Sequence, residues 1–497
     1  MDELRSRIDK IDRKLVELLE DRFEVAREIG KYKEEHNLSI YDAKRERDKI
    51  DSLGQIASKD KREYMERIMM KIMEQCRTFE EDNKVRYGLL GRRLGHSFSP
   101  QIHKALGGYQ FGLFEKEPEE LEAYMEKGLF DGICVTIPYK RDVMKYCSEI
   151  SDIARESNSV NVVVRRPDGS LYGDNTDYYG FRYMIESEGF SVQGAKCLVL
   201  GSGGVSGTVK KALEDMGADS VRLISRSGED NYDNIDRHYD ADIVVNATPV
   251  GMYPANGTSP VDIAKFSRCK AAVDLIYNPL RTRFVLDAEK AGIPSCGGMK
   301  MLVAQAAKAC NLFTGKEICP ETIEKVIKKT EIEQANIVMI GMPGAGKTST
   351  GKILSNSIDR EFIDMDCMVK NKTGMTPAEI IETEGEDAFR DIETENLKKA
   401  LRRGGKVVAC GGGVVERDEN YEILRENSIV VYLKRDLDKL PVRGRPLSKD
   451  NGVEVLYRRR SPKYESWSDI QVDNVGVGKT AKILAKMIGL DREEEDE

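Results

Sequence analysis

The sequence predicts a multidomain protein with an all-α module at the N-terminus, a two-lobed α/β region in the middle and an α/β domain at the C-terminus. Apolar residues recur at alternating three- and four-residue steps between Leu4 and Ile29, which indicates one long helix. Two apolar stretches, residues 197–200 and 337–340, each run into a glycine-rich turn and a helical pattern, which is typical of α/β domains. A chain of 497 residues is also too long for a single hydrophobic core.

Composition narrows the class of protein. Hydrophobic residues make up 40% and charged residues 33%, which is typical of a soluble globular protein. The net charge of −8 disfavours a nucleic-acid partner, and the lack of any run of about 18 apolar residues disfavours a membrane span. The chain is charged from Asp2 onwards, so we expect no secretory signal and a cytoplasmic location. The ten cysteines form no CxxC pair, which favours reduced thiols, and residues 491–497 read as an acidic tail.

Charged residues interrupt the apolar stripe of the N-terminal helix. Arg22 stands where an apolar residue is due, and Lys33, eleven residues on, lies on nearly the same face. Either the Arg22 side chain extends out of the helix seam to water, or it belongs to a buried anion site. Arg5 lies about 25 Å from Arg22 along the helix, so only an antiparallel helix of a second subunit could bring the two together. We therefore expect a homodimer through this small module.

Two shorter helices should follow, over residues 41–50 and 64–79. Through LRSRID, Asp21-Arg22, Lys33 and DAKRER, residues 1–83 resemble the all-helical chorismate mutase family. The resemblance implies that Arg22 and the partner's Arg5 bind the substrate carboxylates, and that Lys33 and Glu80 face the ether oxygen whose bond breaks. It also implies substrate-binding roles on the second helix for Asp42, Arg45 and Glu46.

Two positions depart from that family's pattern. Glu80 stands where Gln is common and must be protonated to donate a hydrogen bond, which favours activity at lower pH. Cys76 stands where a small hydroxyl is often found. The alternative for this module is a dimerisation or regulatory domain without catalytic activity.

The first half of the central region carries a candidate acid–base pair. The strand in GICVTIPYK, residues 132–140, ends in a proline turn that projects Lys140, and GDNTD places Asp177 just before a helix. Each residue alone is more often an ordinary surface charge. Together, at the ends of strands, they indicate a site.

The second half of the central region carries a candidate dinucleotide site. The strand at residues 197–200 runs into Gly201, Gly203 and Gly204 and then a helix, although the spacing is not strictly GxGxxG. The next strand ends at Arg226, which favours the 2′-phosphate of NADP over NAD. Glu229 and Asp230 follow closely and weaken that preference.

In this order, the motifs of residues 84–330 resemble shikimate dehydrogenase, a two-lobed α/β dehydrogenase with a Rossmann half. The substrate lobe would comprise residues 84–185 with the C-terminal helices, and the NADP lobe residues 186–295. Lys140 would be the general acid, and Asp177 would orient it. The substrate would be bound by Ser97, Ser99, Thr136, Asn161, Tyr277 and Gln305. The cofactor would be bound by Gly201, Ser202, Gly203, Gly204, Val205, Ser225, Arg226, Ser227 and Thr248.

Three substitutions separate this region from the family's pattern. Cys134 replaces an Asn, Ser225 replaces the Asn before Arg226, and Asp230 stands where a basic residue is usual. A close relative acting on quinate is the main alternative. A last helix carries Ile323 and Ile327, and the polar residues 328–334 then read as a linker to the next domain.

The C-terminal domain begins with a P-loop. The strand at residues 337–340 leads into GMPGAGKT, whose backbone N–H groups can surround phosphate oxygens while Lys347 reaches the outer phosphates and Thr348 ligates Mg²⁺. The expected nucleotide-binding residues also include Gly344, Ala345, Gly346 and Ser349. A second strand ends in Asp364 and Asp366, which can serve Mg²⁺ and a substrate hydroxyl.

Arginines and a glycine turn complete this pattern. Arg390 lies on a predicted helix, and the strand KVVAC runs into Gly411, Gly412 and Gly413. Arginine clusters in VRGRPL and YRRRSPKY suit a phosphate and a small carboxylate better than nucleic acid, because the clusters are short and acidic residues surround them.

Residues 335–490 resemble shikimate kinase, an α/β P-loop kinase. The resemblance implies that shikimate is bound by Asp366, Arg390, Gly411, Gly412, Gly413 and Arg460. Thr348 and Asp364 would bind Mg²⁺, Arg445 would close over the phosphates, and Arg443 would lie near the adenine. Only Gly444 separates these two arginines, so the lid is shorter than in relatives. Gluconate-type and nucleoside monophosphate kinases share the P-loop but not this combination of motifs.

The three resemblances predict a cytoplasmic, homodimeric, trifunctional enzyme of aromatic amino-acid biosynthesis that uses NADP(H), ATP and Mg²⁺. It would reduce 3-dehydroshikimate, phosphorylate shikimate and rearrange chorismate to prephenate. The alternative is a bifunctional dehydrogenase and kinase whose helical module only dimerises or regulates.

Overall fold

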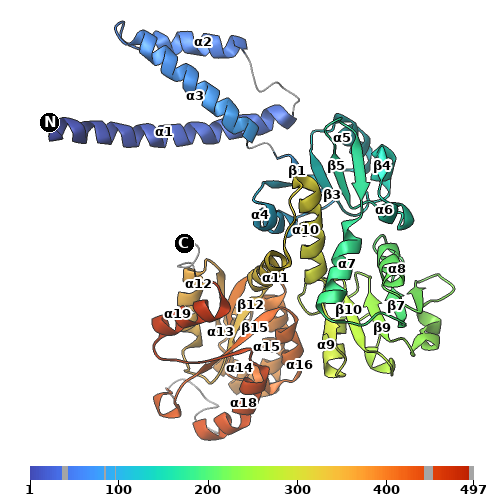
Figure 1. The fold of residues 1–497 in the computed structure, drawn as a ribbon. Coiled ribbons are helices and arrows are strands. Elements are labelled where there is room, and N and C mark those ends of the chain that lie inside the picture. The colour runs from blue at the N-terminus through green and yellow to red at the C-terminus, as the bar shows by residue number, and fades with distance from the viewer. Residues whose placement is uncertain (36–42, 83–84, 96, 441–451, 492–497) are drawn as a thin grey trace.

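The computed structural model describes residues 1–35, 43–82, 85–95, 97–440 and 452–491. The N-terminal module contains three helices, α1 (Asp2–Glu35), α2 (Ala43–Gly54) and α3 (Arg62–Asp82). The long helix expected from the apolar periodicity is confirmed, and acidic residues in its first turn and Lys33 in its last turn match the helix dipole. Figure 1 shows this module standing apart from the α/β domains. Among the described residues, none of the helices has the length and apolarity needed to cross a membrane.

The central region begins with a mixed six-stranded sheet in the order β2-β1-β3-β5-β6-β4. Its strands are β1 (Tyr87–Gly91), β2 (Phe111–Glu115), β3 (Gly132–Val135), β4 (Glu149–Ile150), β5 (Val162–Arg165) and β6 (Leu171–Asp174). Its helices are α4 (Ser99–Gly107), α5 (Leu121–Lys127) and α6 (Asp152–Glu156). Strands β1, β2 and β3 run parallel, whereas β5 runs antiparallel to both of its neighbours.

The second sheet is parallel throughout, with the order β11-β10-β9-β7-β8. Its strands are β7 (Lys196–Leu200), β8 (Ser220–Ile224), β9 (Ile243–Asn246), β10 (Ala271–Asp274) and β11 (Ser295–Cys296), with helices α8 (Ser206–Asp215) and α9 (Arg283–Lys290). The chain passes from β7 to β8 on one side and then continues to β9 on the other. This reversal leaves a crevice at the carboxyl ends of β7 and β9, where doubly wound sheets bind ligands.

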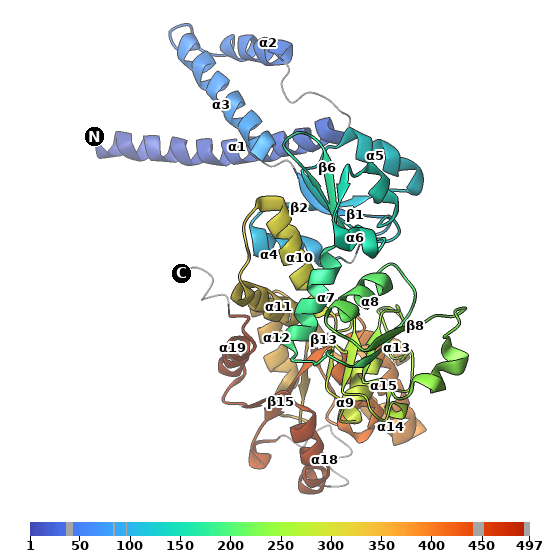
Figure 2. The same ribbon diagram turned by 45° about the vertical axis from the view of Figure 1, so that its right-hand side comes forward.

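Long helices join the two lobes of the central region. Helix α7 (Thr176–Ser187) packs closely on α10 (Met299–Thr314), and α10 also packs on α4 and on α11 (Pro320–Gln334). Figure 2 shows α7 and α10 between the sheets of the two lobes. Their contact is where one lobe meets the other.

The expected linker at residues 328–334 is wrong, because these residues are the last two turns of α11. Only Ala335 separates α11 from the first strand of the C-terminal domain. The Arg360 guanidinium donates to the carbonyls of Ile332 and Ala335, each at 2.8 Å, and so binds the end of α11. A polar surface on an amphipathic helix gives the same residue pattern as a linker, which explains the error.

The C-terminal domain is a parallel five-stranded sheet in the order β13-β14-β12-β15-β16, with helices on both faces. Its strands are β12 (Asn336–Ile340), β13 (Glu361–Asp364), β14 (Lys406–Ala409), β15 (Ser428–Lys434) and β16 (Ile470–Asp473). Its helices are α12 (Lys347–Ser357), α13 (Met365–Thr373), α14 (Pro377–Glu384), α15 (Glu386–Leu401), α16 (Glu419–Glu426), α18 (Val453–Trp467) and α19 (Val477–Ile488). The central strand β12 is fully buried and ends at the P-loop.

Neighbouring positions on α12 allow a matched test of this core. Leu354 is 0% exposed, whereas Ile353 beside it is 41% exposed. We expect Leu354→Ala to lower the free energy of unfolding of the C-terminal domain by about 2–5 kcal/mol, because it removes buried methyl groups and leaves a cavity. Urea unfolding followed by the fluorescence of Trp467, the single tryptophan of the chain, measures this domain. Ile353→Ala serves as the control and should cost much less; equal losses would contradict the assigned core.

Candidate active sites

The helical module brings Arg22 against the third helix. The Arg22 guanidinium, half-buried on α1, donates to the Sγ of Cys76, which is buried on α3. Glu46 on α2 forms an ion pair with Arg77 on α3. The Glu46 carboxylate therefore has a basic partner that the sequence analysis did not foresee.

The remaining residues expected at this site are dispersed. Lys33 is half-buried near the end of α1, and Arg45 is exposed on α2. Arg5 is exposed, and its Nη1 lies 3.7 Å from Asp2 Oδ1. Asp42 falls outside the described residues, and so does the side chain of Glu80. Within one chain, Arg5 is at the far end of α1 from Arg22, as its sequence separation requires.

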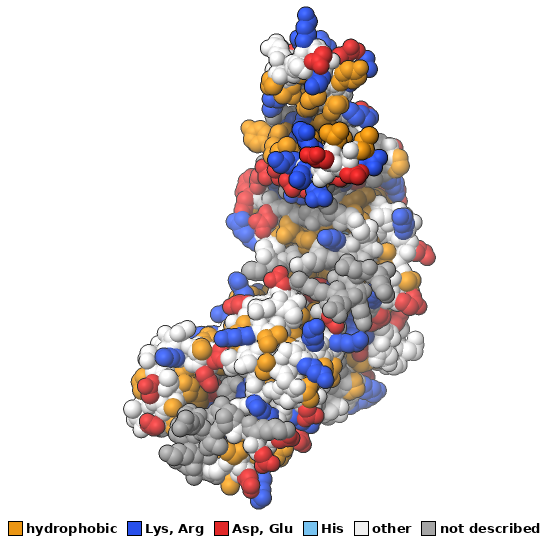
Figure 3. Space-filling model, turned by 90° about the vertical axis from the view of Figure 1, so that its left-hand side faces the viewer, with side chains coloured by type: hydrophobic (Ala, Val, Ile, Leu, Met, Phe, Trp, Pro, Cys, Tyr) orange, Lys and Arg blue, Asp and Glu red, His pale blue; other side chains and the backbone are white. Residues whose placement is uncertain are grey.

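The apolar stripe of α1 remains uncovered in the single chain. Six of its members are each at least half exposed in the described residues, whereas Ile29 is half-buried. The exposed members are Leu4, Ile8, Ile11, Leu15, Leu18 and Val25. Figure 3 shows hydrophobic side chains gathered on this module. Contiguous apolar surface of this kind marks a contact surface.

Lys140 and Asp177 form a direct ion pair at the junction of the two central lobes. Lys140 Nζ lies 2.6 Å from Asp177 Oδ2, and the two side chains are 17% and 11% exposed. Asp177 lies in the first turn of α7, where the side chain of Asn175 caps the helix by accepting from the Asp177 N–H at 3.1 Å.

Other expected substrate residues lie around this pair. The Thr176 hydroxyl accepts from the Asn161 side-chain amide at 3.0 Å and donates to Gln305 Oε1 at 3.3 Å. Thr176 therefore links the residue before β5 to helix α10. The hydroxyls of Ser97 and Ser99 lie 3.1 Å apart at the start of α4. Thr136 follows β3 and is half-buried.

Tyr277 connects the two lobes. It lies in the loop after β10, and its ring packs edge-on against Phe98 of the Ser97–Ser99 loop with centroids 5.5 Å apart. Burial raises the pKa of the Tyr277 hydroxyl.

The loop that carries Thr248 is fixed by a buried network that the sequence analysis missed. Asn246, at the end of β9, accepts from the Thr248 hydroxyl at 2.6 Å and donates to the Asp274 carboxylate at 3.1 Å. Asp274, at the end of β10, also accepts from the Thr282 hydroxyl at 2.6 Å. Burial raises the pKa of Asp274 to about 6. Asn246 and Asp274 could have been found in the sequence, because each stands at the end of a buried apolar strand.

The glycine turn after β7 approaches Thr248 closely. Gly201 has φ +109°, and a Cβ there would lie 3.0 Å from Thr248 Cγ2, so only glycine fits without strain. Gly203 and Gly204 face open space, with the exposed Ser202 between them and Gly201. The turn passes through Val205 into the N-terminus of α8, whose N–H groups suit a phosphate.

Arg226 is exposed just beyond β8, between Ser225 and Ser227. The neighbouring carboxylate of Asp230 is directed to His238, with Oδ1 2.9 Å from Nε2. Asp230 therefore has a partner on its own loop, which reduces its expected repulsion of a phosphate.

The P-loop is held by its own side chains. Lys347 is buried and donates to the carbonyls of Gly341, at 2.8 Å, and Met342, at 3.0 Å. Gly346 has φ +102° and precedes α12, and Gly344 also has positive φ. Asn474 donates to the Ala345 carbonyl at 2.6 Å, and Ser349 follows on α12.

A cation site is compatible with the oxygens beside this loop. The Thr348 hydroxyl donates to Asp364 Oδ2 at 2.6 Å, so two oxygens of the kind that Mg²⁺ prefers lie side by side. Asp364 also caps α13 by accepting from the Cys367 N–H at 3.0 Å. Arg443 and Arg445 lie outside the described residues.

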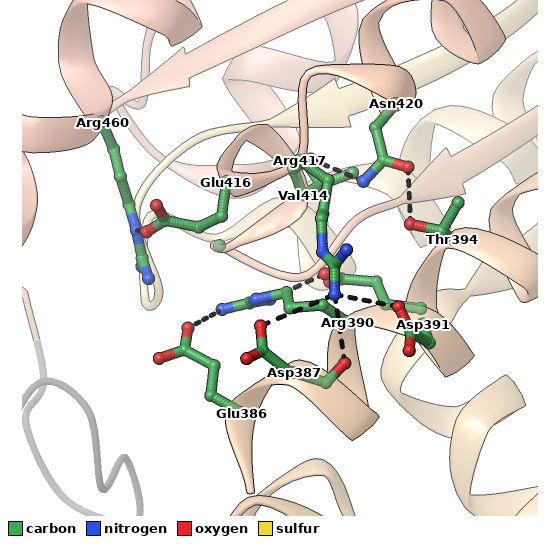
Figure 4. Close-up of polar contacts among 12 residues, drawn as sticks. Glu386, Asp387, Arg390, Asp391, Thr394, Val414, Glu416, Arg417, Asn420 and Arg460 are labelled. Carbon is green, nitrogen blue, oxygen red and sulfur yellow. Dashed lines mark hydrogen bonds and ion pairs between the residues drawn. The ribbon is translucent and has the colours of Figure 1, made fainter.

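Two buried arginines lie beyond the sheet. Arg390 on α15 donates to Glu393 at 2.7 Å and to Glu386 at 2.8 Å, and Arg460 on α18 donates to Glu416 at 2.5 Å. Figure 4 shows both arginines extending into the same part of the domain. Within the described part of the chain, Nε of Arg390 and Nη2 of Arg460 are buried without a hydrogen-bond partner, so both can still bind an anion.

The turn after β14 approaches these groups closely. A Cβ on Gly413 would lie 2.1 Å from an Arg390 nitrogen, and one on Gly411 would lie 2.7 Å from Glu393 Oε1 and 3.2 Å from Asp366 Oδ1. Tyr464 donates to the Gly412 carbonyl. The turn therefore lies close to Arg390 and Asp366, and also to Glu393, which the sequence analysis missed, as it missed the Glu416 partner of Arg460. Glu393 could have been found from its i+3 spacing to Arg390.

Comparison with known proteins identifies the families of the three domains. Residues 4–81 match the model of chorismate mutase type II, residues 89–163 that of the shikimate dehydrogenase substrate binding domain, and residues 343–490 that of shikimate kinase. The shikimate dehydrogenase (NADP(+)) of Clostridium beijerinckii is 38% identical over 244 residues, which are 45% of this chain and 89% of that protein. The chain belongs to the shikimate dehydrogenase family. It is a fusion that also carries a chorismate mutase domain and a shikimate kinase domain.

Two further relatives resemble the same part of the fusion. The shikimate dehydrogenase (NADP(+)) of Methanopyrus kandleri is 37% identical over 274 residues, covering 48% of this chain and 93% of that protein. A crystal structure of a chorismate mutase/shikimate 5-dehydrogenase fusion protein from Clostridium acetobutylicum is 34% identical and covers 49% of this chain and 96% of its own, with a TM-score of 0.47.

The buried arginine of the kinase domain gives a stability prediction. Burial raises the pKa of the Glu393 carboxyl, although the Arg390 guanidinium beside it favours the charged form. We expect Glu393→Ala to destabilise the kinase domain by about 3 kcal/mol, because it leaves the Arg390 charge buried with one partner fewer.

Urea unfolding followed by Trp467 fluorescence measures this loss. Glu395→Ala is the matched control on the same helix, where the side chain is 64% exposed, and it should change stability by less than about 0.5 kcal/mol. A loss for Glu393→Ala no larger than that of the control would refute the role of this pair.

Proposed function

We propose that this chain is a trifunctional enzyme of aromatic amino-acid biosynthesis that works as a homodimer in the cytoplasm. Residues 84–330 would reduce 3-dehydroshikimate to shikimate with NADPH, residues 335–490 would phosphorylate shikimate at its 3-hydroxyl with ATP, and residues 1–83 would rearrange chorismate to prephenate. The observation that carries the proposal is the Lys140–Asp177 pair, 2.6 Å apart and largely buried where the two lobes meet. A lysine held there can donate a proton to a carbonyl oxygen.

In the dehydrogenase domain, the chain's own residues bind and orient the substrate. Ser97 and Ser99 bind the carboxylate, and Thr136, Asn161 and Gln305 bind the ring hydroxyls. Lys140 donates the proton to the carbonyl oxygen, and the Asp177 carboxylate keeps the ammonium group directed at it. Bound NADPH supplies the hydride. Tyr277 and Thr248 separate the reacting atoms from water.

The proposed preference for NADP over NAD follows from the residues at the end of β8. The turn from Gly201 to Val205 binds the pyrophosphate, and Ser225, Arg226 and Ser227 bind the 2′-phosphate. The pairing of Asp230 with His238 at 2.9 Å supports NADP over NAD, because this carboxylate already has a partner on its own loop.

In the kinase domain, Lys347 and the P-loop N–H groups bind the phosphates of ATP, which supplies the phosphoryl group. Thr348 and Asp364 hold Mg²⁺. Asp366 accepts the proton of the 3-hydroxyl, while Arg390 and Arg460 bind the carboxylate from two sides. Arg445 would close over the phosphates, and Arg443 would lie near the adenine.

In the mutase domain, catalysis requires only a compact substrate conformer and fixed donors, because no proton moves. Arg22 and the partner's Arg5 bind the carboxylates, Lys33 and Glu80 meet the ether oxygen, and Asp42, Arg45 and Glu46 lie near the ring hydroxyl. The exposed apolar stripe of α1 supports pairing with a second copy.

A panel of three variants tests the assignment of activities. We expect Lys140→Met to lower NADPH-dependent reduction about 1,000-fold, because it removes the proton donor. Lys347→Met should abolish phosphorylation only, and Arg22→Ala should abolish the mutase reaction only while the dimer persists. Each purified variant is assayed for all three reactions, and its mass in solution is measured. Loss of the dimer in Arg22→Ala, with no mutase activity in the parent enzyme, would favour a module that only dimerises.

Arg226 gives a second test. We expect Arg226→Ala to raise the KM for NADPH about tenfold with little change for NADH, because one phosphate contact is lost. Lys265→Ala, which removes a cation from another surface of the same lobe, is the control. Equal changes for both cofactors would contradict the 2′-phosphate assignment.

A further inference from the structure

The kinase domain contacts the nucleotide-binding lobe of the dehydrogenase through the end of α16. Figure 1 shows α16 beside α9, and the two helices are in contact. The backbone N–H of Arg281 donates to the Glu426 carbonyl at 2.9 Å, and the N–H of Leu280 donates to the Asn427 side chain at 3.4 Å. The Arg281 guanidinium donates to the carbonyl of Arg425 at 3.2 Å. The loop at residues 280–283 is therefore bound by main-chain and side-chain groups of the kinase.

A second dehydrogenase loop, residues 253–256, is bound by the same face. The Glu426 carboxylate accepts from the Asn256 side chain at 2.6 Å. Arg402 donates to the Pro254 carbonyl at 2.9 Å, and Arg403 donates to the Tyr253 hydroxyl at 3.2 Å. Glu426 thus contacts both loops, one through its backbone and one through its side chain.

An ion pair completes this contact. Arg283, in the first turn of α9, pairs with Glu422 of α16 as well as with Asp287 on its own helix. Arg283 and Glu422 are each about a third exposed, so water weakens the pair without removing it.

Each bound loop follows a residue of the candidate dehydrogenase site in the chain. Loop 253–256 belongs to the segment after β9 that begins with Thr248, and loop 280–283 follows Tyr277. Thr282, adjacent to the bound Arg281, donates to Asp274 at 2.6 Å, and Asp274 is joined through Asn246 to Thr248. Thr282 is 1% exposed, and Asp274 and Asn246 are 0% exposed. A series of hydrogen bonds, interrupted by the covalent bond from Arg281 to Thr282, therefore links the kinase to Thr248.

We propose that the kinase domain positions the cofactor side of the dehydrogenase site, with Glu426, Glu422 and Arg283 as positioning residues. The kinase face holds the two loops in place, and the buried network transmits that constraint to Thr248 and Tyr277. The proposal rests on the proposed roles of these two residues in the reductase reaction. The dehydrogenase domain of this fusion then depends on its neighbour for part of its affinity for NADPH.

Substitutions of Glu426 in the full-length chain test the proposal. Glu426→Ala removes the acceptor for Asn256 and should raise the KM for NADPH about fivefold with little change in kcat. Glu426→Gln retains an acceptor and should restore the KM to near the parent value. Glu419→Ala is the matched control, because Glu419 lies on the same helix with its side chain 51% exposed and pairs only within the kinase.

Charge reversal at the Arg283–Glu422 ion pair provides an independent test of the proposal. Arg283→Glu and Glu422→Arg should each raise the KM for NADPH, and the double variant should bring it back to within about twofold of the parent enzyme. Phosphorylation of shikimate is measured on every variant and should not change, which distinguishes positioning from general destabilisation.

The outcomes separate this proposal from the one on which it rests. If the parent enzyme reduces 3-dehydroshikimate but all variants keep its KM for NADPH, or if both activities fall together, the positioning role is wrong. If the parent enzyme shows no reductase activity at all, the proposed function is overturned first, and this inference with it.

Discussion

A cation taken out of water must be met by fixed acceptors, and both α/β enzyme domains of this chain are built around that constraint. Lys140 is met by the Asp177 carboxylate, Lys347 by two P-loop carbonyls and Arg390 by two glutamates. Among the described residues, Nε of Arg390 is buried without a hydrogen-bond partner and so remains as a donor for a ligand. Anionic substrates can then bind without the protein having to rearrange around a bare charge.

The strands explain how the acceptors come together. In both parallel sheets the loops at one edge carry the functional groups: Asn246 and Asp274 end neighbouring strands, and the P-loop ends the central strand of the kinase. Residues far apart in sequence meet there because parallel strands all finish on the same side. The helical module has no such edge, and its charges lie along helices whose apolar face stays uncovered in one chain.

The sequence predicted the three architectures, because glycine turns after apolar strands and the helical periodicity are local signals. In the α/β domains it also pointed to residues that the structure brings together, such as Lys140 and Asp177. Contacts between segments that are far apart in the chain could not be predicted from the sequence. The pairing of Arg460 with Glu416 joins residues 44 positions apart, and the pairing of Asp230 with His238 depends on how one loop folds back. The junction at residues 328–334 was misread for the same reason, since the contacts that hold this polar helix end come from Arg360 and Gly405 of the next domain.

That junction also limits how the fusion can change in evolution. With only Ala335 between α11 and β12, inserting one residue within the last turn of α11 would rotate everything downstream by about 100° around the helix axis. The kinase would then present a different surface to the reductase. Insertions and deletions at this point should therefore be rare among fusions that share this arrangement, while the surface loops elsewhere are free to vary in length.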